Sequence, residues 1–198
     1  MKVYQHPLSG HCHRVVLFLS LLGLEAELIE VDAVNGGTRT PGFLKLNRFG
    51  QVPVLVDGDA VITDSNAILV YLARKARRSD WLPDTPMGEA SVQKWLSVAA
   101  GELAYGPAAA RIMRLFGGKG HPDEAIARAH ELFKLLDAEL TERKWLAAPH
   151  PTLAEVALYG YTARAPEGLV SLADYPHVND WLRRIEALPG FVELRRSP

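Results

Sequence analysis

Hydrophobic residues in the first part of the chain alternate between short runs, typical of strands, and a helical stripe. Within residues 11–22 the apolar positions recur at i, i+3, i+4 and i+7, which predicts a helix, and Gly23 is suited to end it. Short apolar runs at residues 2–4 and 28–31 flank this helix. The chain is therefore expected to begin as a βαβ unit.

Proline, glycine and capping residues divide the next segment. Thr40 before Pro41 predicts an N-cap and a first helical residue, opening a short helix through Leu46. Residues 52–56 and 60–63 alternate around a turn and predict a β-hairpin.

A last helix completes the pattern of this part of the chain. Asp64 or Ser65 is expected to cap it, and it runs to about Lys75. The order of elements over residues 1–76 is then βαβαββα.

After residue 76 the pattern changes. Residues 77–87 are polar and proline-containing and predict a linker, and residues 88–198 are expected to be all-helical. The expected helices are residues 89–116 with a bend at Gly106-Pro107, and residues 123–143, 152–164 and 177–188. Thr152 and Glu155 have the spacing of a capping box at the start of the third.

Composition narrows the class of protein. The 198 residues are 48% hydrophobic and 23% charged, with a net charge of -1, so a packed core is expected and the cationic surface of a nucleic-acid-binding protein is not. The longest apolar run, residues 15–22, is too short to span a membrane and lacks the features of a signal peptide. With Cys12 as the single cysteine, a cytoplasmic protein is expected, without a membrane or nucleic-acid partner.

Four stretches, in this order, carry a resemblance to a known family. They are residues 43–55 (FLKLNRFGQVPVL), 64–72 (DSNAILVYL), 151–157 (PTLAEVA) and 181–191 (WLRRIEALPGF). Together they resemble the cytosolic glutathione S-transferase superfamily, of a bacterial, serine-dependent type with theta-, zeta- and phi-like motifs. The resemblance implies a thioredoxin-like α/β domain at residues 1–76, a linker at 77–87 and an all-α helical bundle at 88–198.

The resemblance also implies a glutathione site. Val52, before a cis Pro53, is expected to pair its backbone with the cysteinyl part of the tripeptide. Ser65 is expected to bind the γ-glutamyl carboxylate and Asp64 its ammonium group, at a helix start that favours anions. From the residues alone, a trans proline and an ordinary N-cap are the simpler interpretations.

The glycyl carboxylate needs a donor at the other end of the site. Arg39 and Gln51 are the candidates, because arginine offers a fork matched to carboxylates. Some family members carry a histidine at the position of Thr38, so this corner departs from them. Lys45 is a reserve candidate, although a lone lysine on a short helix is more often solvated.

Two residues compete for the thiol chemistry. By resemblance, Ser9 is the catalytic hydroxyl that donates a hydrogen bond to the glutathione thiolate; otherwise it is a capping serine. Cys12 follows at the spacing of a C-x-x-C motif whose first cysteine is replaced, which favours a small buried residue. The alternative is a thiol that forms a mixed disulfide with glutathione. His11 and His13 are two residues apart and point to different faces of a helix, so no metal site is expected.

A second, apolar site for an electrophile is expected between the two parts of the chain. Its candidate residues are Leu8, His11, Tyr105, Ala108, Arg111, Ile112 and Phe116. A regular helix places residues 104, 108, 111 and 112 on one face, which groups the helical candidates, although such residues usually form core. Arg111 and Arg114 hint at an anionic substrate. A homodimer is implied by the family, with Trp81, Trp95 and Tyr105 as candidate contacts.

The function predicted is glutathione transfer to a small hydrophobic electrophile, with glutathione as co-substrate and no metal. Two alternatives remain: disulfide exchange or peroxide reduction through Cys12, and a non-catalytic interaction module. Isomerase and dehalogenase activities also occur in the superfamily. The sequence leaves the electrophile open, because a fold does not select a reaction.

Overall fold

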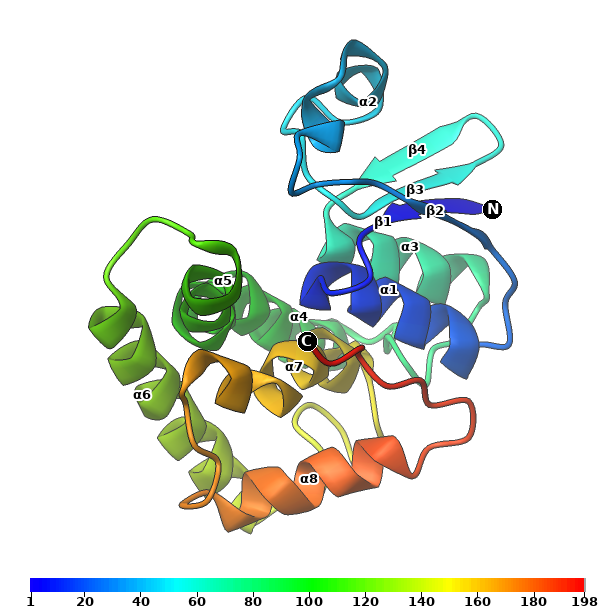
Figure 1. The fold of residues 1–198 in the computed structure, drawn as a ribbon. Coiled ribbons are helices and arrows are strands. Elements are labelled where there is room, and N and C mark those ends of the chain that lie inside the picture. Colours follow the sequence, from blue (N-terminus) through cyan, green and yellow to red (C-terminus); the bar gives the residue numbers. More distant parts are fainter. Residues whose placement is uncertain (198) are drawn as a thin grey trace.

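The protein's structure, a computed structural model that describes residues 1–197, begins with a four-stranded mixed sheet covered by helices (Figure 1). The elements of this region are β1 Lys2–Gln5, α1 Gly10–Leu21, β2 Glu27–Glu30, α2 Pro41–Leu46, β3 Val54–Asp57, β4 Ala60–Thr63 and α3 Ser65–Lys75. The strand order is β2-β1-β3-β4, with β1 and β2 parallel and the other pairs antiparallel. Helices α1 and α3 cover one face of the sheet, and α2 lies on the opposite side (Figure 1). The predicted order βαβαββα is confirmed.

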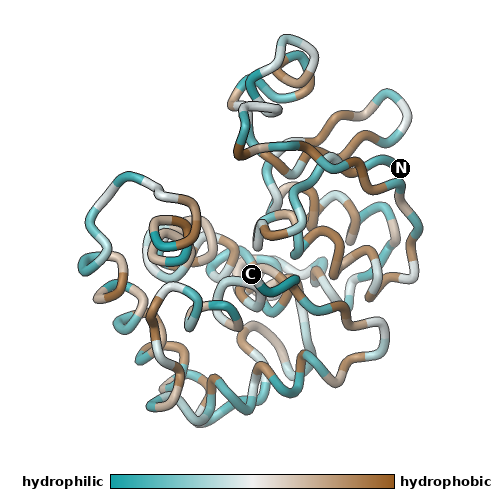
Figure 2. The backbone as a smooth tube through the Cα atoms, viewed as in Figure 1, coloured by the Kyte–Doolittle hydropathy of each residue, from teal (hydrophilic) through white to brown (hydrophobic). Residues whose placement is uncertain are grey.

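A helical domain follows. Its elements are α4 Pro86–Ala100, a π-helical turn Ala104–Ala108, α5 Ala109–Phe116, α6 Pro122–Thr141, α7 Leu153–Ala163, a 3-10 turn Ala165–Gly168 and α8 Pro176–Glu186. Helix α7 is buried on all sides from Leu153 to Thr162, as expected of a central helix. Along α8, by contrast, hydrophobic and hydrophilic residues alternate with the helical turn (Figure 2). The predicted domain limits, 1–76 and 88–198 around a linker at 77–87, stay a prediction.

Local capping explains where the helices begin. The Thr40 hydroxyl accepts a hydrogen bond from the Phe43 N–H at 3.3 Å, directly before Pro41. Of the two cap candidates for α3, Asp64 is the cap: its Oδ1 accepts from the Ala67 N–H at 2.9 Å. The capping box predicted at the start of α7 is confirmed, since Thr152 and Glu155 bond each other's backbone reciprocally.

The long helix expected over residues 89–116 is wrong as one continuous element. Helix α4 stops at Gly101, whose φ and ψ of -101° and -95° lie outside the helical region, and a π-helical turn containing Pro107 precedes α5. The bend was expected at Gly106-Pro107, where the π turn lies. A Cβ on Gly106 would lie 3.0 Å from the Ala129 backbone nitrogen, so glycine lets α6 approach closely. The break and the π turn interrupt the regular helical period, so spacing along a regular helix does not predict which residues of this segment share a face.

Helix α1 packs directly on α7, which joins the sheet region to the helical domain. A Cβ on Gly10 would lie 2.8 Å from the Tyr161 ring, so this contact requires glycine at the first position of α1. Trp81 and Trp95, two of the candidate dimer contacts, are buried in the core, each only 5% exposed. Tyr105, the third, is 66% exposed.

The segment after α8 runs back along α7 toward the start of α1 (Figure 1). The imidazole Nε2 of His13 lies 2.8 Å from the carbonyl oxygen of Val192, and Leu194 is 1% exposed. This segment therefore packs against α1 and the helical domain at once. Among residues 1–197, no helix combines the length and the apolarity needed to cross a membrane.

Candidate functional site

A groove of about 710 Å³ opens beside the sheet, at the starts of α1 and α3. It is lined by His11, Ala33, Val34, Gly36, Thr38, Arg39, Asn47, Phe49, Gly50, Gln51, Val52, Pro53, Thr63, Asp64, Ser65 and Ile112. The structure thus brings together the six residues other than Ser9 that were expected to bind glutathione. They come from three separate segments: the turn before α2, residues 51–53 between α2 and β3, and the start of α3.

The peptide bond between Val52 and Pro53 is cis, which confirms the prediction for this bond. Val52 lines both this groove and a second pocket beside it. Pro53 is buried directly before β3. The middle of the groove therefore lies next to the second pocket.

The start of α3 is held by a buried arginine of α1 that the sequence analysis did not assign to the site. Arg14 donates from Nη1 to the Ser65 hydroxyl at 3.2 Å and to the Asn66 side-chain oxygen at 2.7 Å. Burial lowers the pKa of Arg14 to about 10, against the opposing effects of Tyr161 and Asp64, so it stays charged at neutral pH. Within residues 1–197 it forms no ion pair. Its charge makes this end of the groove favourable for an anion.

Sequence reasoning missed Arg14 because nothing local marks it as part of a site. The signal available was a basic residue adjoining the apolar run 15–19 in a helix expected to pack on a sheet. A lysine or arginine is almost never fully buried unless it is paired. Its side chain is 2% exposed and held between α1 and α3, where Asn66 also donates to the Leu96 carbonyl of α4 at 3.0 Å.

The opposite end of the groove is polar and exposed. Arg39 donates from Nη1 to the Phe49 carbonyl at 3.3 Å. Asn47 is 5% exposed; its amide donates to the Gln51 carbonyl at 2.8 Å, and its oxygen accepts from the Phe49 N–H at 3.0 Å. Asn47 therefore holds the loop that presents Arg39 and Gln51. Lys45, the reserve candidate, does not line the groove.

Ser9 is the N-cap of α1. Its hydroxyl oxygen accepts from the Cys12 N–H at 3.3 Å, and its side chain lines the second pocket. The capping and catalytic interpretations are therefore compatible, because a hydroxyl that accepts one bond can still donate its own proton.

Cys12 is fully buried. Its sulfur lies 3.4 Å from the His6 backbone nitrogen, whose N–H points toward it, and burial raises the pKa of the thiol to about 11. The thiol is therefore protonated at neutral pH and lines neither hollow. The structure favours the interpretation of Cys12 as a small buried residue and gives the mixed-disulfide alternative no accessible thiolate.

His11 forms part of the wall shared by the groove and the second pocket. Its ring lies edge-on to that of Tyr161, with centroids 5.0 Å apart. Burial, with a smaller contribution from the charge of Arg14, lowers the pKa of His11 to about 3. The imidazole is therefore neutral at physiological pH.

The second pocket has a volume of about 400 Å³ and adjoins the groove. It is lined by His6, Leu8, Ser9, His11, Ala33, Val34, Val52, Arg111, Ile112, Phe116 and Tyr161. Five of the seven electrophile-site candidates are among them. Four further lining residues were not predicted from the sequence, because they reach the pocket only through the packing of the two domains. These residues are His6, Ala33, Val34 and Tyr161.

Two of the seven candidates do not line this pocket. Tyr105 is 66% exposed and Ala108 is 1% exposed, and neither lines the pocket. Both residues lie in the π turn, whose period differs from that of a regular helix, so they do not share the face of Arg111 and Ile112 that lines the pocket. Arg111 also gives no support to an anionic substrate. It is 1% exposed, and its Nε lies 2.7 Å from Glu167 Oε2 in an ion pair.

Comparison with known proteins gives matches over nearly the whole chain. The family model "Glutathione S-transferase, N-terminal domain" matches residues 1–74, and "Glutathione S-transferase, C-terminal domain" matches residues 95–189. Glutathione S-transferase 3 of Zea mays is 37% identical over 207 residues, which cover 96% of this chain and 91% of that protein.

Solved structures give the same result. A glutathione S-transferase from Pseudomonas fluorescens has a TM-score of 0.92 and 32% identity, with 98% of each chain covered. One from Xanthobacter autotrophicus has a TM-score of 0.90 and 32% identity, covering 98% of this chain and 96% of the other.

Proposed function

The chain belongs to the glutathione S-transferase family, and we propose that Ser9 stabilises the thiolate of bound glutathione for attack on a small apolar electrophile. The observation that carries the proposal is the position of Ser9. Ser9 lines the apolar pocket beside the groove, whereas the only cysteine is buried with a raised thiol pKa.

The groove suits an anionic tripeptide. The γ-glutamyl carboxylate binds at Ser65, where the start of α3 and the buried charge of Arg14 both favour an anion. Asp64 accepts the ammonium group with the carboxylate oxygen that it does not use for capping. At the other end, Arg39 and Gln51 bind the glycyl carboxylate, and the backbone of Val52 pairs with the cysteinyl part.

Ser9 has to lower the pKa of the bound thiol by only a modest amount. A cysteine thiol of pKa about 8.5 is only a few per cent ionised at pH 7. Lowering that pKa by about two units takes about 2.7 kcal/mol, which one hydroxyl-to-thiolate hydrogen bond and the start of α1 together supply. The Ser9 oxygen accepts the Cys12 N–H, which leaves the hydroxyl proton available for the sulfur.

The reaction then requires the electrophile to lie close to the thiolate sulfur. The thiol proton leaves to solvent, the thiolate donates its electron pair to the electrophilic carbon, and a leaving group departs with the electron pair of the broken bond. Because ionisation gains roughly thirtyfold at most, much of the rate comes from holding the electrophile beside the sulfur. The apolar side chains of Leu8, Ile112 and Phe116 make the second pocket suitable for that purpose.

A homodimer in the cytoplasm is part of the proposal, as the family implies. Trp81 and Trp95 belong to the core, so a contact between copies would use exposed apolar side chains, which include Phe49 at 76%, Met87 at 78% and Tyr105 at 66%. Sedimentation equilibrium tests this directly, and a monomer at micromolar concentration would remove the dimer from the proposal.

The experiment that tests the function identifies the product. The protein is incubated with glutathione and a chlorodinitrobenzene, and in parallel with a glutathione mixed disulfide. Mass spectrometry should show the thioether conjugate in the first reaction, and wild-type turnover should persist in Cys12→Ala. Reduction of the disulfide with loss of that activity in Cys12→Ala would favour the exchange function, and no glutathione binding at all would favour an interaction module.

A further inference from the structure

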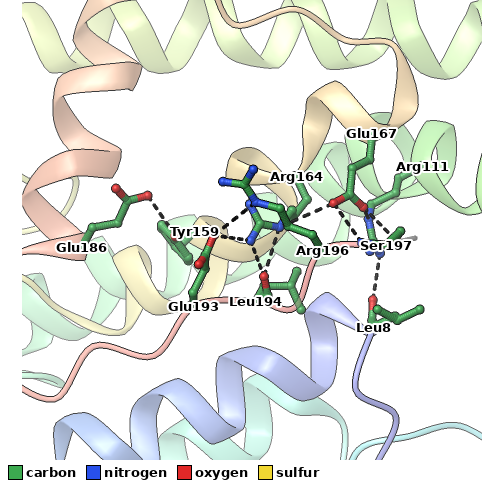
Figure 3. A network of polar contacts seen from close by, with 10 residues as sticks. All are labelled: Leu8, Arg111, Tyr159, Arg164, Glu167, Glu186, Glu193, Leu194, Arg196 and Ser197. Atoms are coloured by element: carbon green, nitrogen blue, oxygen red, sulfur yellow. Dashed lines mark hydrogen bonds and ion pairs between the residues drawn. The ribbon is translucent and has the colours of Figure 1, made fainter.

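Arg111 connects the loop that carries Ser9 to two distant segments (Figure 3). From α5, its Nη1 donates to the Leu8 carbonyl at 2.8 Å, its Nε to Glu167 Oε2 at 2.7 Å, and its Nη2 to the Ser197 hydroxyl at 3.0 Å. The Leu8 carbonyl belongs to the peptide bond that joins Leu8 to Ser9. A helix of the second domain thus fixes the peptide unit next to the catalytic hydroxyl.

The charge of Arg111 is balanced where it lies. The guanidinium is 1% exposed, and Glu167 is its ion-pair partner. Burial alone raises the pKa of Glu167, but hydrogen bonds from Arg111 and Ser197 outweigh it and hold that pKa below its ordinary value. Glu167 is therefore ionised at neutral pH, and Arg111 is a structural cation whose donors point at fixed acceptors.

Ser197 closes this network, and its own position is fixed. Its hydroxyl donates to Glu167 Oε2 at 2.9 Å while accepting from Arg111. The segment that leads to it is held by Arg164, which donates from Nε to the Leu194 carbonyl at 3.1 Å and from Nη2 to Glu193 at 2.6 Å. Figure 3 shows these contacts as one connected set that ends at Leu8.

We propose that Arg111 is a positioning residue for Ser9, and that Glu167 and Ser197 hold Arg111 in place for this role. The inference rests on the proposed function of Ser9. A hydroxyl that must meet a thiolate loses its effect if the peptide unit carrying it can rotate, and misplacement by about 1 Å can cost a hundredfold in rate. The segment at residues 192–197 is then part of the catalytic framework, although it touches neither groove nor pocket.

The alternative is that Arg111, which lines the second pocket, acts directly through its charge on the thiolate. The two roles differ in their dependence on Ser9. A positioning residue has nothing to position when the hydroxyl is absent, whereas a charge acts with or without it.

The test measures the pKa of the bound glutathione thiol by its thiolate absorbance, with glutathione affinity and the unfolding midpoint recorded beside it. The variants are Arg111→Met and the milder Ser197→Ala, each made in the wild-type and in the Ser9→Ala background. Arg114→Met is the matched control, because Arg114 lies exposed on the same helix, whereas the bond to the Leu8 carbonyl comes from Arg111. Ser197→Ala keeps the test valid if Arg111→Met does not fold, since it removes one hydroxyl near the end of the chain.

With Ser9 present, we expect the thiolate fraction at pH 7 to fall roughly threefold to tenfold in Arg111→Met and less in Ser197→Ala. In the Ser9→Ala background neither variant should lower the thiolate fraction further. Arg114→Met should leave the thiolate fraction unchanged in the wild-type and in the Ser9→Ala background. An equal fall in both backgrounds would assign a direct charge effect and overturn the positioning role. A lower unfolding midpoint with an unchanged thiolate fraction would also overturn it, as a purely structural role. If Ser9→Ala itself leaves the thiol pKa unchanged, the proposed function fails first and this inference falls with it.

Discussion

The groove and the second pocket are neighbours built in different ways. Apart from Ile112, the residues lining the groove belong to the first 65 residues, and its two ends carry polar side chains, among them Arg39 and Asp64. The second pocket takes residues from both parts of the chain, and most of its surface is apolar. A glutathione site needs fixed donors and acceptors, while a pocket for varied electrophiles needs shape and apolar surface.

The two hollows nevertheless share a wall. His11, Ala33, Val34, Val52 and Ile112 line both. An electrophile in the second pocket is therefore held beside the middle of the groove, where the thiol of glutathione lies in our proposal. The comparison predicts that substitutions at the far ends of the two hollows have separable effects.

The largest effect is expected at the cap of α3. Asp64→Asn keeps the capping oxygen and suits the φ of 71°, because asparagine tolerates this region. It removes only the negative charge that meets the ammonium group. We expect the glutathione dissociation constant to rise roughly tenfold to a hundredfold, with the KM for the electrophile unchanged.

Isothermal titration calorimetry of glutathione measures this change. Asp59→Asn, an exposed carboxylate in the turn between β3 and β4, loses the same charge and should bind like wild type. Equal binding by Asp64→Asn and wild type would contradict the assignment of the γ-glutamyl end.

The second prediction concerns α1, which supports both hollows. Nε2 of His13 faces the Val192 carbonyl and so carries the ring proton, and Nδ1 is buried without a partner among residues 1–197. Burial lowers the pKa of His13 from 6.5 to about 4. Between these values the unfolded chain binds a proton that the folded chain does not, so stability falls as the pH drops from about 6.5 to about 4.

The size of this effect can be measured in a variant. At pH 5 the His13 contribution is about 2 kcal/mol of lost stability. His13→Gln, which keeps a donor for Val192, should therefore lose less stability between pH 7 and pH 5 than wild type does, by urea unfolding. His11, whose pKa is lowered in the same direction, leaves a residual slope. An equal loss of stability between pH 7 and pH 5 in the variant and in wild type would contradict the buried neutral state of His13.

A smaller effect is expected in the second pocket. Phe116 lines this pocket but not the groove, and it is 40% exposed. Phe116→Ala should raise the KM for an apolar electrophile about fivefold, corresponding to about 1 kcal/mol of lost apolar contact, and should leave glutathione affinity unchanged. Leu135→Ala, at an exposed position on α6, serves as the control for loss of an apolar side chain. A change in glutathione affinity of the same size would show that the two sites are not separable.

The smallest effect is expected at Cys12. A thiol at 0% exposure with a pKa of about 11 should resist alkylation in the folded protein and react only after unfolding. Cys12→Ala should keep turnover close to wild type and lose some stability to the small cavity. Rapid labelling of the native protein, followed by mass spectrometry, would contradict this picture.

The groove was largely predictable because its features are local in sequence. Thr40 before Pro41 and Asp64 before Ser65 carry the signals of helix starts, and each side chain bonds a backbone N–H three residues later. The cis bond before Pro53 was expected only from the family resemblance, because local physical arguments favour a trans bond.

The second pocket was less predictable because it depends on tertiary packing. The π turn around Pro107 breaks the regular period from which Tyr105 and Ala108 were assigned. Tyr161 enters the pocket only because α7 packs against Gly10, a contact between residues 151 positions apart. Arg14 and Arg111 owe their roles to hydrogen bonds across the fold, which no spacing in the sequence indicates.

The most direct test of the central claim is the pKa of the glutathione thiol bound to wild type, Ser9→Ala and Cys12→Ala, titrated by thiolate absorbance. We predict a pKa clearly below that of free glutathione in wild type and in Cys12→Ala, and one near that of free glutathione in Ser9→Ala. A low pKa that survives in Ser9→Ala, or that is lost only in Cys12→Ala, would contradict it.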